Sequence, residues 1–157
     1  MTVNDITNEQ NEFKSFKKEF NLWPKYWEKL KDVADFEWKS CPFDPNNVDL
    51  IPNSKGIYSF VINPRFTNHP QRYLCYIGKA DRTLKVRYRE YFKEMNNEKG
   101  RPKILRLLNL WKGYIEFCYI EIDNVNLLDL EKKLLGAFLP PCNGEYSTDV
   151  NRIVNAF

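Results

Sequence analysis

Two short apolar runs, Ile57–Ile62 and Tyr73–Ile77, are rich in the β-branched and aromatic residues that favour strands. The connection between them, residues 63–71, contains two prolines and other turn-forming residues. A helical pattern of apolar residues then begins near Thr83. The sequence therefore predicts two antiparallel strands followed directly by a helix, and this order restricts the fold class.

The rest of the core pattern adds one strand and two helices to this unit. Apolar residues recur at helical or strand spacing in four segments after residue 80, which we predict as a helix at Thr83–Asn97, a helix between Pro102 and Gly113, a strand at Tyr114–Ile122 and a helix at Leu127–Phe138. This order predicts an α+β fold, in which a small three-stranded antiparallel sheet is flanked by helices.

Residues 1–50 are predicted to form an N-terminal helical extension that packs on a core domain of residues 51–157. Aromatic residues recur at helical spacing between residues 12 and 30, whereas residues 1–10 resemble a frayed tail. Residues 39–55 contain three prolines and predict an irregular connector. Docking on the core is the simplest role for the extension. Contact with nucleic acid and formation of a homo-oligomer through its aromatic residues stay open as alternatives.

The sequence gives no sign of a membrane partner or of secretion. No apolar run approaches the roughly 18–20 residues that cross a bilayer, and the polar N-terminus lacks a signal-peptide pattern. We therefore expect a cytoplasmic protein. The four cysteines are widely separated and form no CxxC pair, so we interpret them as buried apolar residues, neither zinc ligands nor a disulfide framework.

Basic charge is concentrated in one part of the chain. Residues 72–112 contain 12 Lys and Arg against 4 Asp and Glu, although the net charge of the whole chain is only +3. A solvated helix surface would explain part of this excess. Local excess of positive charge next to the two predicted strands is also typical of a protein that binds a polyanion, and we favour this interpretation.

Three charged or phenolic side chains occupy special positions on the predicted helices. Arg87 and Tyr91 are four residues apart, so they lie together on one flank of their helix, toward the sheet edge. Glu131 lies in the middle of the apolar face of the last helix. A buried carboxylate normally has a cationic partner or a metal. An ion pair with a cation such as Arg87 is one explanation, and we favour a metal-ligating carboxylate.

The segments GIY at Gly56–Tyr58 and YIG at Tyr76–Gly78 resemble the defining motif pair of the GIY-YIG endonuclease family. The continuation YIGKADRTLKVRYREYF resembles the nuclease domain of the C subunit of the bacterial excision-repair excinuclease. Further positions of the family's motifs are matched in order by Lys79, Arg87, Tyr91, Glu131 and Asn143. Residues 1–50 have no counterpart in that domain, which favours a stand-alone nuclease over the repair subunit.

The resemblance implies a GIY-YIG nuclease domain over residues 51–157 that hydrolyses phosphodiester bonds, with DNA as the expected partner. It implies that Tyr58 is the general base and that Glu131 is the single protein ligand of Mg²⁺ or Mn²⁺. A free phenol has a pKa of about 10, so a base at neutral pH needs nearby cations. The resemblance further implies that Arg87 makes a bidentate contact with the phosphate and that Lys79 is a cation beside the base. It implies that the hydroxyls of Tyr76 and Tyr91 position water or phosphate. The Asn143 amide would organise the site.

Six cations on or near the Thr83–Asn97 segment are expected to contact nucleic acid, namely Lys79, Arg82, Lys85, Arg87, Arg89 and Lys93. Two other functions remain open. The chain could be a nucleic-acid-binding module of the same fold that does not cleave, or a protein-interaction domain that uses the aromatic N-terminal third. The intact set of site residues argues against the first alternative, and the concentration of basic charge argues against the second.

Overall fold

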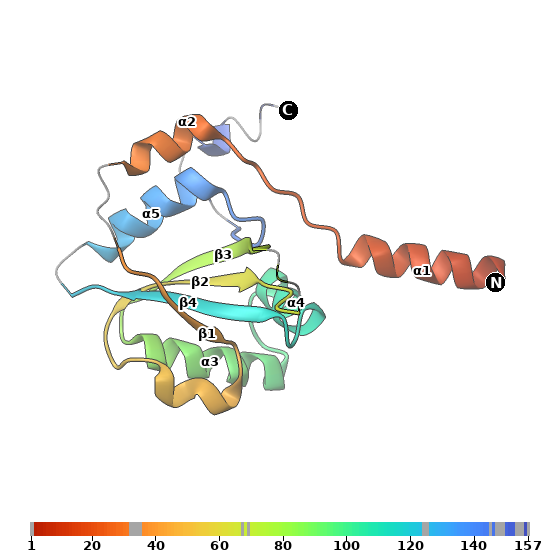
Figure 1. The fold of residues 1–157 in the computed structure, drawn as a ribbon, viewed down its shortest axis with the longest axis horizontal. Helices are drawn as coiled ribbons and strands as arrows, with labels where there is room; N and C mark the ends of the chain where they lie inside the picture. The colour runs from red at the N-terminus through yellow and green to blue at the C-terminus, as the bar shows by residue number, and fades with distance from the viewer. Residues whose placement is uncertain are drawn as a thin grey trace.

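The computed structural model of the 157-residue chain describes residues 2–31, 36–66, 68, 70–123, 126–144, 146, 150–152 and 156. Its elements (Figure 1) are, in chain order, α1 (Val3–Ser15), α2 (Pro24–Trp27), the 3-10 helix η1 (Glu28–Leu30), β1 (Lys39–Pro42), the 3-10 helix η2 (Pro45–Leu50), β2 (Gly56–Ile62), β3 (Tyr73–Ala80), α3 (Leu84–Asn97), α4 (Pro102–Leu110), β4 (Ile115–Glu121) and α5 (Leu127–Phe138). The fold is α+β, as predicted.

The described part of the chain forms one antiparallel sheet of four strands in the order β1-β4-β2-β3. The prediction of three strands was therefore wrong. The additional strand is β1, which pairs with β4 from Lys39 opposite Tyr119 to Pro42 opposite Glu116. It lies in the segment predicted as an irregular connector. A proline is tolerated there because β1 is an edge strand of only four residues.

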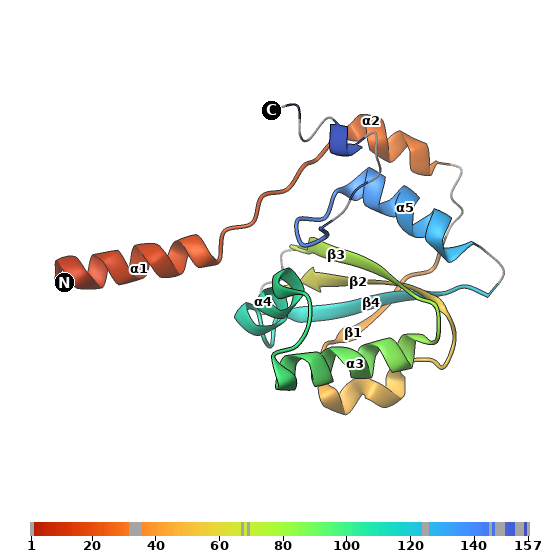
Figure 2. The ribbon, with the colours of Figure 1, turned by 180° about the vertical axis from the view of Figure 1, so that it is seen from behind.

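Helices cover both faces of the sheet, with α3 against one face and α5 against the other (Figures 1 and 2). Successive residues of a strand point to opposite faces. On β2, Tyr58 and Phe60 therefore belong to the core cluster under α3, whereas Ile57 belongs to the cluster under α5. Thr83 caps the start of α3 by accepting a hydrogen bond from the Val86 N–H at 3.1 Å. The cap sets the start of the helix that carries Arg87.

The N-terminal part divides into a projecting helix and a docked segment. α1 begins with a capping box between Thr2 and Asp5, so the expectation of a frayed tail over residues 1–10 was wrong. This helix buries no residue and extends away from the sheet (Figures 1 and 2). Pro24 begins α2, where Tyr26 is buried against Leu139. The domain division at residue 50 and self-association through this part stay predictions.

Two smaller expectations concern membranes and thiols. No helix in the described ranges is long and apolar enough to cross a membrane. All four cysteines are free and buried, as predicted, at positions Cys41, Cys75, Cys118 and Cys142.

Candidate active site

The two glycines of the GIY and YIG segments lie where neighbouring atoms leave no room for a side chain. Tyr58 on β2 pairs with Gly78 on β3, and a Cβ atom at Gly78 would lie 2.6 Å from the Tyr58 hydroxyl oxygen. A Cβ atom at Gly56 would lie 2.0 Å from the carbonyl oxygen of Ile120 on β4. Gly56 therefore allows β2 and β4 to approach closely, and Gly78 allows the Tyr58 ring to lie across β3.

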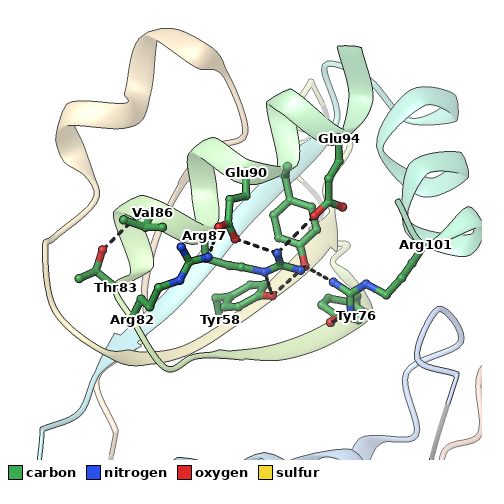
Figure 3. A network of polar contacts seen from close by, with 10 residues as sticks. Tyr58, Tyr76, Arg82, Thr83, Val86, Arg87, Glu90, Glu94 and Arg101 are labelled. Atoms are coloured by element: carbon green, nitrogen blue, oxygen red, sulfur yellow. Dashed lines mark hydrogen bonds and ion pairs between the residues drawn. The ribbon is translucent and has the colours of Figure 1, made fainter. Parts of the chain in front are cut away.

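A network of phenols and guanidiniums lies between the sheet and α3 (Figure 3). The hydroxyls of Tyr58 and Tyr91 are 2.7 Å apart. Arg87 donates from Nε to the Tyr58 hydroxyl at 3.0 Å and from Nη2 to the Tyr91 hydroxyl at 3.2 Å. The structure thus brings together three of the residues that the sequence singled out, and it buries both phenols at 1% exposure or less.

Arg101 is a member of this network that the sequence analysis did not identify. It precedes the first residue of α4, and it donates from Nη1 to the Tyr76 hydroxyl at 2.6 Å and from Nη2 to the Tyr91 hydroxyl at 2.8 Å. In the sequence it is one of many cations in the basic segment, and no spacing distinguishes it. Only the packing of α4 against the sheet edge places its guanidinium on the phenols.

Burial changes the acidity of the two central phenols. The loss of hydration raises the pKa of Tyr58 well above its ordinary value, and the neighbouring Tyr76 adds to this effect. The Arg87 charge opposes the shift but does not cancel it. Burial likewise raises the pKa of Tyr91. Both phenols are therefore protonated at neutral pH in the protein without substrate.

Glu131 on α5 lies in the wall of a cavity of about 330 Å³. Four other predicted site residues line the same cavity, together with Arg101, and they are Tyr58, Tyr76, Lys79 and Arg87. Glu131 is only partly buried, whereas the sequence placed it in the middle of an apolar face. Loss of hydration still raises its pKa, with the Lys79 charge acting in the opposite direction.

The predicted alternative, an ion pair between Glu131 and Arg87, does not form in the described structure. Arg87 instead pairs through Nη1 with two carboxylates of its own helix, Glu90 at 3.0 Å and Glu94 at 3.3 Å (Figure 3). Glu131 lines the cavity, where the Lys79 backbone and the charges of Lys79 and Asp81 act on its carboxylate.

The six predicted nucleic-acid contacts fall into two groups. Lys79, Arg82 and Arg87 line the cavity, where Lys79 pairs with Asp81 and Arg82 pairs with Glu90. The remaining three lie elsewhere on α3. They are Lys85, which is partly buried at 3.7 Å from Asp49, and the exposed Arg89 and Lys93.

Asn143 acts on the backbone of β3. Its side chain accepts a hydrogen bond from the Ile77 N–H at 3.0 Å and donates one to the Ile77 carbonyl oxygen at 2.8 Å. β3 is an edge strand of the sheet, and these two bonds satisfy the backbone groups of Ile77, between Tyr76 and Gly78, in the way that a neighbouring strand would. The asparagine therefore holds the strand that carries Tyr76, and its role in an active site stays a prediction.

The oxygen donors of the cavity fit a hard divalent cation that has few protein ligands. No group of three or more His, Cys, Asp or Glu side chains that could hold a metal occurs among the described residues. Mg²⁺ needs no such group, because it keeps several waters and is typically bound by one or two carboxylates together with substrate phosphates. Glu131 supplies one carboxylate at the cavity wall, so the residues present fit Mg²⁺ or Mn²⁺ bound together with an anionic substrate.

The cavity is lined by one lysine, two phenols, three guanidiniums (Arg82, Arg87 and Arg101) and three carboxylates (Asp81, Glu90 and Glu131). The buried Tyr91 hydroxyl is joined to this lining by hydrogen bonds with Tyr58, Arg87 and Arg101. Such a site can bind a phosphate diester through its cations and can offer both hydroxyls and a carboxylate to a reacting group. Comparisons of the chain with models of known protein families, with curated proteins and with solved structures found no match.

Proposed function

We propose that the protein is a metal-dependent endonuclease of the GIY-YIG type that hydrolyses phosphodiester bonds in DNA. The observation that carries this proposal is the convergence of Tyr58, Tyr76, Lys79, Arg87 and Glu131 on one cavity. These residues come from β2, β3, α3 and α5, and each of them matches a position of the family's motifs. Unrelated surface residues have no reason to meet in this way.

Of the three guanidiniums that line the cavity, Arg87 and Arg101 are bonded to the phenols, and these two are the groups best suited to the phosphate. Arg87 reaches the cavity from α3 and Arg101 reaches it from the start of α4, so that a phosphate between them could accept hydrogen bonds from both. Arg87 would have to exchange its contacts with Glu90 and Glu94 for the phosphate oxygens. The backbone position of Arg87 need not change, since both partners lie on the same helix.

Tyr58 is the proposed general base. Its hydroxyl already accepts a hydrogen bond from Arg87 at 3.0 Å, and such a donor stabilises the phenolate. Because burial raises the pKa of this phenol, the free protein does not hold the active form at neutral pH. A further cation beside the ring, which the bound metal would supply, is therefore part of the proposal, because Lys79 in the cavity wall is already paired with Asp81.

Glu131 would bind Mg²⁺ or Mn²⁺ through its carboxylate. When bound, the metal would polarise the phosphate and stabilise the leaving oxygen. Partial burial of a carboxylate in the cavity wall lowers the stability of the folded protein, and such a cost is typical of a residue that is retained for function.

The proposal is tested by a plasmid-nicking assay with Mg²⁺ or Mn²⁺ and with EDTA. We expect metal-dependent nicking by the wild type, and loss of it in Glu131→Gln. The matched control is Asp129→Asn on the same helix, whose exposed carboxylate pairs with Lys133 away from the cavity. Nicking that survives Glu131→Gln, or that is lost equally in Asp129→Asn, would contradict the assignment.

A non-cleaving nucleic-acid-binding module is the second candidate, and two observations favour it. Arg87 is neutralised by Glu90 and Glu94, and the Tyr58 phenol is protonated at neutral pH. This candidate predicts DNA binding that weakens steeply with salt, without nicking in either metal. The same plasmid assay, run beside a gel-shift assay, separates the two functions.

A further inference from the structure

A second and larger cavity, of about 800 Å³, adjoins the smaller one. It lies between the first turn of α4, one side of α5 and the chain that follows α5. Tyr76, Arg101 and Glu131 line both cavities. The larger cavity is therefore continuous with the proposed active site, and whatever occupies it lies next to the scissile phosphate.

The charged groups of the larger cavity favour an anion. Of the described side chains that line it, Arg101, Lys103 and Lys132 are cationic and Glu131 is anionic. Lys103 comes from α4 and Lys132 from α5, so the cations stand on two sides of the cavity. A polyanionic strand that leaves the smaller cavity would meet positive charge on both sides.

The remaining lining is largely apolar or aromatic. It includes Ile104 on α4, Leu128 and Leu135 on α5, and Tyr146. The Tyr146 hydroxyl donates to the Pro140 carbonyl oxygen at 3.0 Å, and this bond holds the ring in place. Cavities of roughly 300–1,000 Å³ with apolar walls and a few polar groups suit a flat ring system of small-molecule size.

We propose that the larger cavity binds an unpaired nucleotide of the cleaved strand, the one that adjoins the scissile phosphate. This inference rests on the proposed nuclease function and names its substrate class, DNA with an unpaired nucleotide at the cleavage position. A base within a duplex is stacked and paired, and it enters a cavity only after it leaves the stack. Substrates that already present an unpaired base avoid that cost.

The first test measures binding without cleavage. A fluorescein-labelled 12-nucleotide single strand and the matching blunt 12-base-pair duplex are titrated in EDTA and followed by fluorescence anisotropy. Tyr146→Leu removes an aromatic ring from the cavity wall and keeps an apolar side chain at a partly buried position, so the fold should tolerate it. Because stacking of one base on an aromatic side chain typically contributes about 1–3 kcal/mol, we expect the ratio of single-strand to duplex affinity to fall roughly 5- to 150-fold.

A charge-reversal pair gives an independent measurement. Lys132→Glu and Lys133→Glu change the net charge equally and lie side by side on α5, but only Lys132 lines the cavity. We expect Lys132→Glu to weaken single-strand binding clearly more than Lys133→Glu. Equal losses in the two variants, together with an unchanged affinity ratio in Tyr146→Leu, would overturn the inference.

A cleavage experiment distinguishes failure of this inference from failure of the proposed function. Wild-type protein with Mg²⁺ is given a fully paired duplex and the same duplex with one splayed nucleotide at the cleavage position. Faster cleavage of the splayed substrate, lost in Lys132→Glu, supports both. Equal cleavage of the two substrates overturns the substrate class and leaves the nuclease function standing. If neither substrate is cleaved, the nuclease proposal fails. The assignment of the larger cavity to a nucleotide of the cleaved strand then fails with it.

Discussion

The two faces of the sheet are built from different kinds of side chain. The layer between the sheet and α3 is rich in aromatic rings, among them Tyr58, Phe60 and Phe117 from the strands and Tyr88 and Tyr91 from α3. The core cluster between the sheet and α5 is aliphatic, namely Ile57, Ile77, Ile120, Ile122, Leu127, Leu130 and Leu134, and the buried Ser59 lies on the same side. Both layers remove apolar surface from water. They differ in how many of their buried side chains carry polar atoms.

This difference explains why the proposed chemistry lies on one side. A buried hydroxyl needs a hydrogen-bond partner. The phenols of Tyr58, Tyr76 and Tyr91 find theirs in Arg87 and Arg101, whereas Tyr88 donates to the Asp44 carbonyl oxygen at 2.7 Å. The aliphatic layer makes no such demand and contributes packing alone. Tyr58 and Ile57 are neighbours in the chain, yet they serve different layers because successive strand residues point to opposite faces. We therefore expect substitutions on the two faces to affect different measurements.

The largest expected effect is that of Tyr58→Phe on cleavage. The variant keeps the ring and loses the proposed base, so the single-turnover rate should fall roughly 10²- to 10⁴-fold while DNA binding survives. Tyr76→Phe should reduce the rate less, because its hydroxyl positions groups without taking the proton. The measurement is the single-turnover rate of plasmid nicking in Mg²⁺.

The pH profile of the same reaction checks the role of the phenol. Since burial raises the Tyr58 pKa above its ordinary value, the wild-type rate should still increase with pH in the alkaline range. Tyr58→Phe should lose this increase and Tyr76→Phe should keep it. If Tyr76→Phe loses the increase and Tyr58→Phe keeps it, the two roles are exchanged. If both variants keep the increase, neither phenol is the general base.

Next in size is the effect of Leu130→Ala on stability. Leu130 is 3% exposed in the aliphatic layer, and truncation of a buried leucine typically costs about 2–5 kcal/mol. We expect urea unfolding to shift accordingly, while the cleavage rate of the protein that remains folded stays unchanged. A Leu130→Ala protein with native stability, or with a strongly reduced rate, would contradict the division between the two faces.

A smaller effect is expected from Gly78→Ala, which changes the packing between the strands. The added Cβ would overlap the Tyr58 hydroxyl, and overpacking of this kind typically costs about 1–3 kcal/mol. Tyr58 should also be displaced, so the cleavage rate should fall together with the melting temperature. The control is Gly136→Ala in α5, where a Cβ meets nothing within 4 Å and alanine should stabilise the helix by up to about 1 kcal/mol.

The smallest expected effect is the contribution of Glu131 to the pH dependence of stability. Its folded pKa is raised by burial, so between the unfolded value of about 4.3 and the folded value the native state binds more protons than the unfolded state. In metal-free buffer, stability due to this group is therefore lost as the pH rises through that window. Glu131→Gln should lose less stability than the wild type over the same interval in thermal melts. An identical decline in both proteins would show that the carboxylate is not desolvated.

The sequence by itself determined the elements that depend on local pattern. The runs at Ile57–Ile62 and Tyr73–Ile77 predicted β2 and the first part of β3 because strand preference and turn residues are local properties. The spacing of Arg87 and Tyr91 on one helix flank likewise predicted that they point together, and both contact Tyr58 in the structure. Periodicity is enough for such conclusions, because it fixes direction relative to the element itself.

Only the tertiary structure decided which distant groups meet. The strand β1 is too short and too rich in proline to carry a strand pattern, and it exists because β4 offers it an edge. Arg101 joins the phenols because α4 packs beside the sheet. These contacts depend on how whole elements pack, and no local pattern in the chain specifies that packing.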